Sequence, residues 1–430
     1  MLSVGIDWAD DHHDVVLVDM ASTDACSRLD RFRIAHSCEG FEGLHAKVRE
    51  HETDPSQVLV AIETPHGLLV HDMVQHGYCV YAINPKSVNR YKDRHSPASP
   101  KDDGRDAMAL AHLLRTDRQH YKPLETLPAD YHLMDELCKD LRQLVDDRAR
   151  IVNRLESCLK DYYPQALGLF SRLDGRISMS FLRSYPDPAQ LKSLTKKQFI
   201  AFLKKNRYPY PGRVDALYAH VSAKALTAHP VIARAGRMRM LALLDQIVTV
   251  QHHVQDYERQ IQELFDMLPE SERISNLPGV GGRIGPELVA TLGPGPNETR
   301  KEPADDPDQE PTQTPCRFAT AQALEKLAGT APVTRQSGNW KNVNYRRACD
   351  KRLRRTLHDW AGCSLRTSRW ARAFYDHHKQ QGHRHSTILR NLACKLLAIL
   401  HRIWRTGEDY DEQRHIDNLK KHNVVWATQL

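Results

Sequence analysis

The sequence predicts a mixed α/β domain at the N-terminus, followed by long helices and then by a mainly helical domain. Two short apolar segments, residues 3–9 and 13–19, are separated by a charged turn, which is typical of a β-hairpin. Residues 57–63 form a continuous apolar run, which indicates a strand buried on both faces. Helical periodicity begins near residue 130. The chain of 430 residues is therefore expected to combine an α/β part with an all-α part.

The other elements of the first part follow in alternation. Residues 31–36 alternate like a third strand, and residues 39–51 have the spacing of a helix. Residues 67–77 are expected to form a short helix that ends at a glycine, and residues 79–85 a fifth strand. A hairpin and a third strand, followed by alternating helix and strand, fit a mixed sheet with helices packed on it. We place this domain at residues 1–125.

The middle of the chain contains two long amphipathic segments. Leucine and valine recur at three- and four-residue intervals over residues 130–164, and residues 233–268 repeat the pattern. Each segment is long for a globular helix, so the pair predicts an antiparallel or an intersubunit coiled coil. We place this region at residues 126–270, with short inserted helices. Because the helices are charged outside their apolar stripes, we expect them to help hold a homo-oligomer, a dimer or a tetramer.

A third domain is expected over residues 271–405. It is interrupted at residues 293–315 by a segment rich in Pro, Asp and Glu, which predicts a disordered acidic loop. The last residues, 406–430, have the composition of a polar tail.

The glycine-rich turn near the start of this third domain belongs to a segment that resembles a helix-hairpin-helix. Gly279, Gly281 and Gly282 precede a predicted helix, where their backbone N–H groups can approach a phosphate. A plain turn between two helices is the alternative.

The charge distribution points to a polyanionic partner. The chain has 61 Lys and Arg residues against 54 Asp and Glu residues, a net charge of +7, but basic residues far outnumber acidic ones between residues 335 and 405. Such a concentration is typical of a nucleic-acid-binding surface. The cations expected to contact nucleic acid are Arg346, Arg347, Arg352, Arg354 and Arg355.

Cysteine usage and hydropathy predict a cytoplasmic protein. The nine cysteines are scattered singly, which favours free thiols in a reducing compartment over disulfides or zinc sites. The N-terminus is charged by its seventh residue and lacks the apolar core of a signal peptide. The most apolar late run, residues 392–404, is too short and too basic to cross a bilayer. We expect no membrane partner.

Four acidic residues fall where the predicted sheet would bring them to one edge. Asp7 lies in the middle of the first strand, Glu63 ends the buried strand, and Asp103 and Asp106 share one face at a helix start. An ionised carboxylate inside a strand is unfavourable unless it is paired or liganded. Carboxylates suit hard cations such as Mg²⁺ or Mn²⁺, and two such ions about 4 Å apart clamp a phosphodiester. The alternative is that these residues only cap the helix, as Asp102 could, or form ion pairs.

The segments that carry these acidic residues resemble a known family. "GIDWADDHHDVVLVD", "AIETPHG", "AINPKSVNRYK" and "KDDGRDAMALAHLL" are similar to the N-terminal domain of DEDD transposases of the insertion-sequence-110 family. The resemblance implies a RuvC-like, ribonuclease-H-like fold and assigns the family's four acidic positions to Asp7, Glu63, Asp103 and Asp106. Asp102 falls where the family often has Thr or Asn, so the resemblance leaves it as a cap.

The C-terminal half follows the family's second domain. "NLPGVGGRIGPELVATLG", "AGTAPVTRQSG" and "RRACDKRLRRTLHDWAGCS" occur in the family's order. On its residues alone, Ser337 is an ordinary loop serine. The resemblance implies that Ser337 attacks a DNA phosphodiester and becomes covalently linked to it, with Arg335 neutralising the phosphate. It also implies a structured guide RNA that pairs with donor and target DNA.

These observations predict a DNA transposase or recombinase of an insertion sequence. One alternative is a metal-only, structure-specific nuclease such as a junction resolvase, in which Ser337 would be incidental. The other is a non-catalytic nucleic-acid-binding protein that has kept the fold. The presence of all four carboxylates counts against this second alternative.

Overall fold

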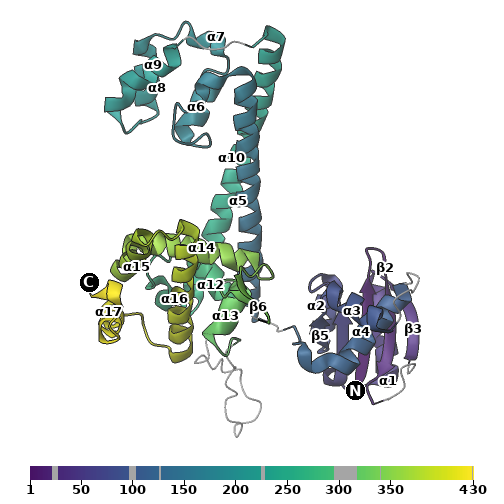
Figure 1. Cartoon of the computed structure of the whole chain (residues 1–430). Helices are drawn as coiled ribbons and strands as arrows, with labels where there is room; N and C mark the ends of the chain where they lie inside the picture. The colour runs from purple at the N-terminus through teal and green to yellow at the C-terminus, as the bar shows by residue number, and fades with distance from the viewer. Residues whose placement is uncertain are drawn as a thin grey trace. The chain divides into compact units, whose positions relative to one another are not determined.

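The computed structural model of the chain divides into two compact units, Met1–Thr126 and Leu127–Leu430, which are described separately (Figure 1). The structure describes residues 1–21, 28–95, 103–124, 127–223, 228–294, 317–338, 340–428 and 430.

The first unit contains a five-stranded mixed sheet in the order β3-β2-β1-β4-β5. Its strands are β1 (Leu2–Trp8), β2 (His12–Asp19), β3 (Arg28–Ala35), β4 (Val58–Ile62) and β5 (Cys79–Ala82). The predicted hairpin is β1–β2, which is antiparallel, whereas β1 is parallel to β4 and β4 to β5. The predicted fold class, a mixed sheet followed by a helical part, is confirmed.

Helices cover both faces of this sheet. They are α1 (Cys38–His51), α2 (Leu68–Gln75), α3 (Pro85–His95) and α4 (Asp103–Asp117). Because strand side chains alternate between faces, Val60 and Ile62 of β4 pack with α1 and α2, whereas Leu59 and Ala61 pack with α3 and α4. This burial on both faces explains why β4 is a continuous apolar run.

Helix α4 packs closely on strand β1. The Ser3 hydroxyl donates a hydrogen bond to the carbonyl oxygen of Ala111 over 2.8 Å. One helical turn earlier, a Cβ atom at position 5 would overlap the carbonyl oxygen of Ala107, so only glycine fits there. Two strand residues and four helical residues both advance by about 6 Å. The helix therefore runs antiparallel to β1 and begins at the strand's carboxyl end.

The second unit is built on two long helices that pack along each other, α5 (Ala129–Tyr162) and α10 (Pro230–Met267). The Cys158 thiol faces the carbonyl oxygen of Gly236 over 3.5 Å, and the Tyr257 hydroxyl donates to Asp140 over 3.3 Å. Residue numbers therefore rise along one helix and fall along the other. This is the antiparallel pairing that was one of the two predicted arrangements, and it forms within one chain. A contact between subunits stays a prediction.

Short helices form a separate core at one end of the helix pair (Figure 1). They are α6 (Arg176–Ser184), α7 (Pro188–Leu191), α8 (Lys196–Lys205) and α9 (Val214–Ser222). Phe181 and Phe199 are buried there against Tyr162 of α5 and Met240 of α10.

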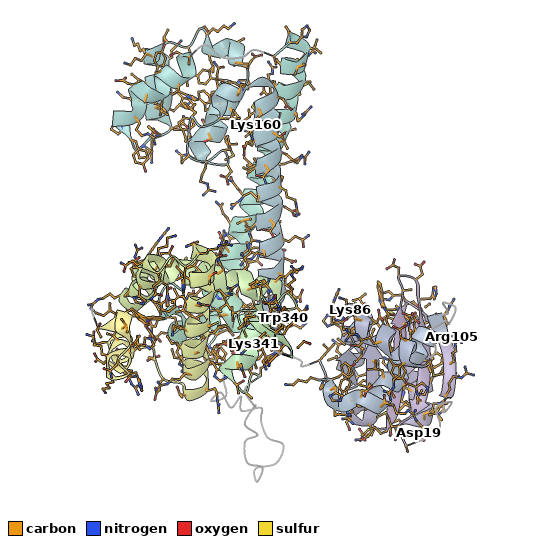
Figure 2. The ribbon with its side chains drawn as sticks, viewed as in Figure 1. Asp19, Lys86, Arg105, Lys160, Trp340 and Lys341 are labelled. Carbon is orange, nitrogen blue, oxygen red and sulfur yellow. The ribbon has the colours of Figure 1, made fainter. Side chains whose placement is uncertain are left out.

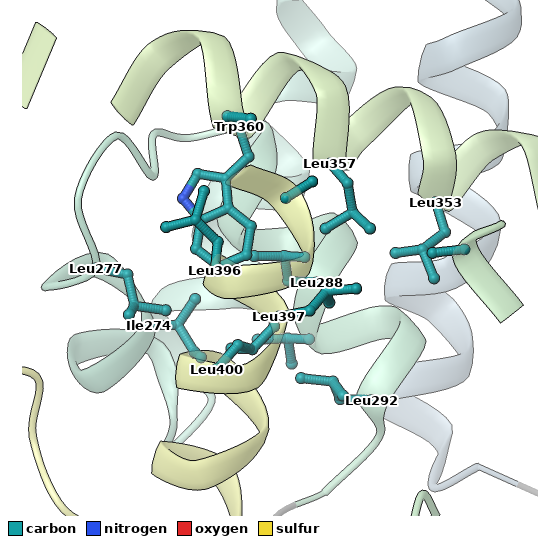
Figure 3. Close-up of a cluster of buried hydrophobic side chains, with 14 of the residues drawn as sticks. Ile274, Leu277, Leu288, Leu292, Leu353, Leu357, Trp360, Leu396, Leu397 and Leu400 are labelled. Atoms are coloured by element: carbon teal, nitrogen blue, oxygen red, sulfur yellow. The ribbon is translucent and has the colours of Figure 1, made fainter. Parts of the chain in front are cut away.

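A larger core lies at the other end of the helix pair. Its helices are α11 (Ser271–Ser275), α12 (Ile284–Leu292), α13 (Ala321–Ala328), α14 (Lys351–Thr367), α15 (Arg369–Gln380) and α16 (His385–Thr406). Figure 3 shows the centre of this core, where Trp360 of α14 lies near Leu288 of α12 and Leu396 of α16. The Trp360 indole donates to the carbonyl oxygen of Pro278 over 2.9 Å, so this tryptophan also anchors the turn before α12.

The C-terminal segment is folded onto this core. The expected polar tail contains helix α17 (Glu412–Lys421), whose Ile416 is buried, and a 3-10 turn, η5 (Val425–Ala427). Trp426 packs edge-to-face on Phe374 of α15. Five apolar residues of this segment pack in the core, Tyr410, Ile416, Leu419, Trp426 and Leu430, and they are enough to dock a segment that is polar overall. Residues 295–315 of the expected acidic loop lie outside the described residues.

Two further sequence expectations can be compared with the described part of the chain. The cysteines there are all free thiols, as expected: Cys38, Cys79, Cys138, Cys158, Cys349, Cys363 and Cys394. None of the helices described has the length and apolar character needed to span a membrane.

Replacing Gly5 by alanine tests the close contact between α4 and β1. The added Cβ must push the helix away from the strand, so Gly5→Ala is expected to destabilise the first unit by about 3 kcal/mol. Hydrogen exchange of the β1 and β4 amides in the full chain measures this loss.

Gly43→Ala is the matched control. Gly43 lies inside α1 with open space around its Cα, so alanine is expected to stabilise the helix by about 0.5–1 kcal/mol. Unchanged amide protection in Gly5→Ala would contradict the assignment of this contact.

Candidate active site

Asp7 and Glu63 lie at the carboxyl ends of two neighbouring parallel strands. Ile6 of β1 is paired with Ile62 of β4, so Asp7 and Glu63 are the next residues along the two chains. Asp7 is the second-last residue of β1 rather than its middle, and both carboxylates are half-buried. Because side chains alternate along a strand, Asp7 shares the face of Gly5, which is the face that α4 covers.

The start of α4 reaches the same edge of the sheet. Gly5 lies against Ala107. Asp7 is two residues further along the strand and Asp103 is one helical turn earlier in the helix, so the backbone of Asp103 is level with Asp7. Asp103 is the first residue of α4. Its side chain lies outside the described residues, as does all of Asp102, so the predicted cap at Asp102 stays a prediction.

Asp106 is close enough to Glu63 to affect the pKa of the Glu63 carboxyl. Burial raises the pKa of Glu63, the Asp106 carboxylate raises it further, and the Lys92 ammonium opposes both effects. Lys92 of α3 forms an ion pair with Asp106. Two predicted ligands and one cation therefore share one electrostatic environment beside the sheet edge.

The chemistry of the side chains at this edge suits a divalent metal ion. Asp7, Glu63 and Asp106 offer only carboxylate oxygens, the donors that hard cations prefer. Burial, and after it the Asp106 carboxylate, raises the pKa of Glu63, so the charged form of Glu63 is unfavourable here, and a bound cation would stabilise it. The structure thus brings Asp7, Glu63 and Asp106 to one edge of the sheet, with the backbone of Asp103 beside them. Metal binding by these four residues stays a prediction.

Two charged residues at this edge were missed by the sequence analysis. Lys92 pairs with Asp106, and Asp14 of β2 stands opposite Asp7 in the β1–β2 register. Asp14 is buried and forms an ion pair with Arg33 of β3 over 2.8 Å. The position of Asp14 in a strand, in step with the buried Val16 and Val18, was the signal that could have identified it.

Among the described residues, two groups of histidine and aspartate side chains have ligand atoms that all lie within 4.8 Å of one another: His45, Asp72 and His76, and His252, His253 and Asp256. Asp7, Glu63 and Asp106, which are also among the described residues, do not form such a group in this structure. In the first group, the His45 ring nitrogens already face the Tyr78 hydroxyl over 2.9 Å and Asp72 over 2.6 Å. The second group is largely exposed on α10. Hydrogen bonding accounts for the first group without a metal.

Ser337 lies in the second unit, at the end of an exposed β-hairpin. The hairpin consists of β6 (Val333–Ser337) and β7 (Trp340–Asn344), and Ser337 is paired with Trp340 across a two-residue turn. Gly338 has a φ of +55°, a left-handed conformation that such a turn requires and that glycine adopts easily. Arg335 precedes Ser337 on the same strand face and is exposed.

In the glycine-rich turn before α12, close packing requires a glycine at one of the three predicted positions. Gly279 has a φ of +77°, and a Cβ atom there would overlap the backbone of α14 at Cys363 and Ser364. Gly281 has open space, and a Cβ at Gly282 would approach only the Gln262 side chain. A phosphate contact by Gly279, Gly281 and Gly282 stays a prediction, with Gly281 the least constrained of the three.

Some of the predicted nucleic-acid-binding arginines have partners inside the protein. Arg352 of α14 pairs with Asp135 of α5, and Arg355 pairs with Asp146 over 2.7 Å. Beside them, Arg142 pairs with the buried Glu287 over 2.7 Å. Arg352 is only 17% exposed, so its main role is to hold α14 on α5.

The remaining predicted arginines lie at the base of the hairpin. The Arg354 guanidinium stacks on the Tyr345 ring at 4.5 Å and donates to the carbonyl oxygen of Arg346 over 2.8 Å. Arg347 is exposed. Their contact with nucleic acid stays a prediction.

Comparisons with known proteins agree with this arrangement. A family model for DEDD transposases of the IS110 type matches residues 4–164, which include Asp7, Glu63, Asp103 and Asp106. A second model, described as the transposase IS116/IS110/IS902 family, matches residues 311–376, which include Ser337.

Similar proteins cover most of the chain. The mini-circle putative transposase for IS117 of Streptomyces coelicolor is 32% identical over 420 residues, 95% of each chain. The putative transposase y4uE of Sinorhizobium fredii is 30% identical over 205 residues, 47% of this chain and 56% of that protein. An uncharacterised 43.6 kDa protein of insertion element IS110, also from S. coelicolor, is 24% identical over 371 residues, 83% of this chain and 84% of that protein.

The acidic edge, the order of the two matched regions and a relative that spans nearly the whole chain lead to one conclusion. The chain belongs to the IS116/IS110/IS902 family of transposases, enzymes that act on DNA.

Proposed function

We propose that this transposase cuts and rejoins DNA with Ser337 as the nucleophile, assisted by metal ions at Asp7, Glu63, Asp103 and Asp106. The observation that carries the proposal is the convergence of Asp7, Glu63 and the start of α4 at one sheet edge. Ser337 lies on an exposed hairpin beside an exposed arginine, which is consistent with a role as the nucleophile.

The metal-binding part would hold Mg²⁺ or Mn²⁺. DEDD transposases depend on divalent metal ions, and an all-carboxylate donor set suits these hard cations. When bound, such ions polarise a phosphodiester and lower the pKa of a coordinated hydroxyl. Asp7 and Glu63, fixed on two paired strands, would set the position of the ions, and Lys92 would release Asp106 when a cation binds.

The serine step conserves the energy of the phosphodiester. The Ser337 oxygen forms a bond to phosphorus, one phosphorus–oxygen bond of the DNA backbone breaks, and the serine proton passes through solvent to the departing DNA oxygen. Arg335 lies two residues away on the same face of β6, where its guanidinium can neutralise the attacked phosphate. The reverse step rejoins DNA without an external nucleotide.

Sequence choice would come from a guide RNA. The family resemblance implies an RNA encoded by the element that pairs with donor and target DNA, in which case the protein recognises the nucleic-acid backbone and shape. The exposed cations Arg335, Lys341 and Arg347 are suited to such phosphate contacts. A homo-oligomer, dimer or tetramer, would bring two DNA segments together.

Replacing Asp103 by asparagine tests the metal site. Losing one carboxylate ligand is expected to lower DNA cleavage by more than about 100-fold while nucleic-acid affinity is retained. A second readout is thermal unfolding: the rise in melting temperature that Mg²⁺ produces in the wild type should disappear. Asp117→Asn, at the opposite end of the same helix, is the control and should behave like the wild type. Full cleavage by Asp103→Asn would remove this residue from the site.

Replacing Ser337 by alanine tests the nucleophile. The variant is expected to bind DNA normally yet to form no covalent protein–DNA adduct and no recombinant product, because no other hydroxyl replaces the missing oxygen. Mass spectrometry of nuclease-digested protein, from cells that carry the insertion element, detects the adduct. Thr334→Ala removes a hydroxyl from the other face of the same strand and should retain activity. Recombination by Ser337→Ala at the wild-type rate would instead favour a metal-only nuclease.

Sequencing the RNA that co-purifies with the protein tests the guide. We expect one structured RNA species, encoded by the element next to the transposase gene, to be enriched over total cellular RNA. Its depletion by ribonuclease should abolish recombination and leave the folded protein intact. Recovery of only abundant cellular RNAs, together with full activity after ribonuclease treatment, would contradict guidance by RNA.

A further inference from the structure

We propose that Trp340 stacks on a base of the DNA strand that Ser337 attacks and thereby positions the phosphodiester at the serine hydroxyl. The inference rests on the proposed function, since it takes Ser337 as the nucleophile. It assigns a role to a residue that neither the acidic edge nor the serine motif includes.

The register of the hairpin places the two side chains together. Ser337 and Trp340 are directly opposite in the β6–β7 pair, so they project from the same face, with Cβ atoms about 5 Å apart. The next pair on that face is Arg335 with Asn342. The Trp340 ring, the Ser337 hydroxyl and the Arg335 guanidinium thus lie on one face of the hairpin. In this order they are placed to contact a base, its phosphate and the next part of the DNA backbone.

Trp340 is exposed where a folding role would bury it. The residue is 56% exposed, whereas Trp360, Trp370 and Trp404 are almost completely buried in the core of the same unit. Figure 2 shows Trp340 and Lys341 at the surface of the second unit. A tryptophan with this much apolar surface in water gains free energy when a flat partner covers it.

The surrounding charge selects nucleic acid as that partner. Residues 326–349 contain no Asp or Glu, and their cations are Lys326, Arg335, Lys341, Arg346 and Arg347. An aromatic ring among cations is the combination that binds single-stranded nucleic acid, because bases stack on the ring and phosphates pair with the cations. A protein partner that covered Trp340 would also have to neutralise this positive charge.

The base of the hairpin is held firmly, so the ring has a fixed platform. Tyr345, just after β7, lies under the guanidinium groups of Arg354 at 4.5 Å and Arg390 at 5.3 Å. The amide of Asp350 donates to the carbonyl oxygen of Leu327 over 2.8 Å, which ties the segment after the hairpin to α13. A nucleotide stacked on Trp340 would therefore be held at a defined position relative to the Ser337 oxygen.

The test measures binding of a 20-nucleotide single-stranded DNA of mixed sequence to the full chain, with Ser337→Ala in every protein so that no reaction occurs. Adding Trp340→Ala should weaken binding about tenfold, the loss expected for one stacked base. Trp340→Phe should bind within about threefold of the parent, because a phenyl ring also stacks. Val343→Ala, an equally exposed apolar residue on the other hairpin face, should have no effect.

Fluorescence and salt dependence separate stacking from an indirect effect. DNA binding should quench the tryptophan fluorescence of the parent. The part of the emission that is quenched should be missing in Trp340→Phe. The slope of binding affinity against salt concentration should stay unchanged in Trp340→Ala, because stacking releases no counterions. In the protein that carries Ser337, adduct formation should fall in Trp340→Ala and recover in Trp340→Phe.

Two results would overturn the proposal: unchanged affinity with no quenching assigned to Trp340, or a lower oligomeric state of Trp340→Ala in light scattering with unchanged DNA binding. The second result would assign the ring to a protein interface. Because DNA binding is measured without Ser337, a failure of the serine mechanism leaves this measurement interpretable. If Trp340 stacks on DNA but the protein recombines without Ser337, the assignment of Ser337 as the nucleophile is refuted. The assignment of Trp340 as a DNA contact is then kept.

Discussion

The close packing of helix α4 on strand β1 determines where the acidic residues meet. Gly5 lets the helix backbone approach the strand, and the Ser3 hydroxyl ties the next turn of the helix to the sheet. With this spacing set, the helix begins level with the carboxyl end of β1, beside the carboxyl end of β4. Carboxylates from three separate segments can then share one edge, although they are about 40 to 100 residues apart in the chain.

Local patterns were sufficient to predict most of the first unit. The hairpin, the buried strand β4 and the helices between strands each have a short-range signal in alternation or apolar continuity. The predicted strand at residues 57–63 is observed as Val58–Ile62, with Glu63 directly after it. Asp7 was predicted in the middle of its strand because alternation does not define where a strand ends, whereas it is the second-last residue of β1.

Charged residues were harder to interpret because their roles depend on partners distant in sequence. Arg352 and Arg355, predicted to contact nucleic acid, also form ion pairs with Asp135 and Asp146, which lie more than 200 residues earlier, on α5. The pairing of Lys92 with Asp106 likewise needs the packing of α3 against α4. Segment 406–430 was judged by composition, although a few apolar residues such as Ile416 and Trp426 dock it.

The antiparallel pair of α5 and α10 behaves as a spacer of adjustable length. Its two ends belong to different apolar cores, one with α6–α9 and the other with α11–α16, so neither core depends on the number of turns between them. Adding seven residues to each helix would lengthen the spacer by about 10 Å and leave the facing sides nearly in register, since seven residues make almost two turns. An insertion into only one helix would put the contacts beyond the insertion out of register. We therefore expect the spacer to tolerate insertions only when both helices gain the same number of residues. Such paired insertions would change the distance between the two cores without changing the packing inside either core.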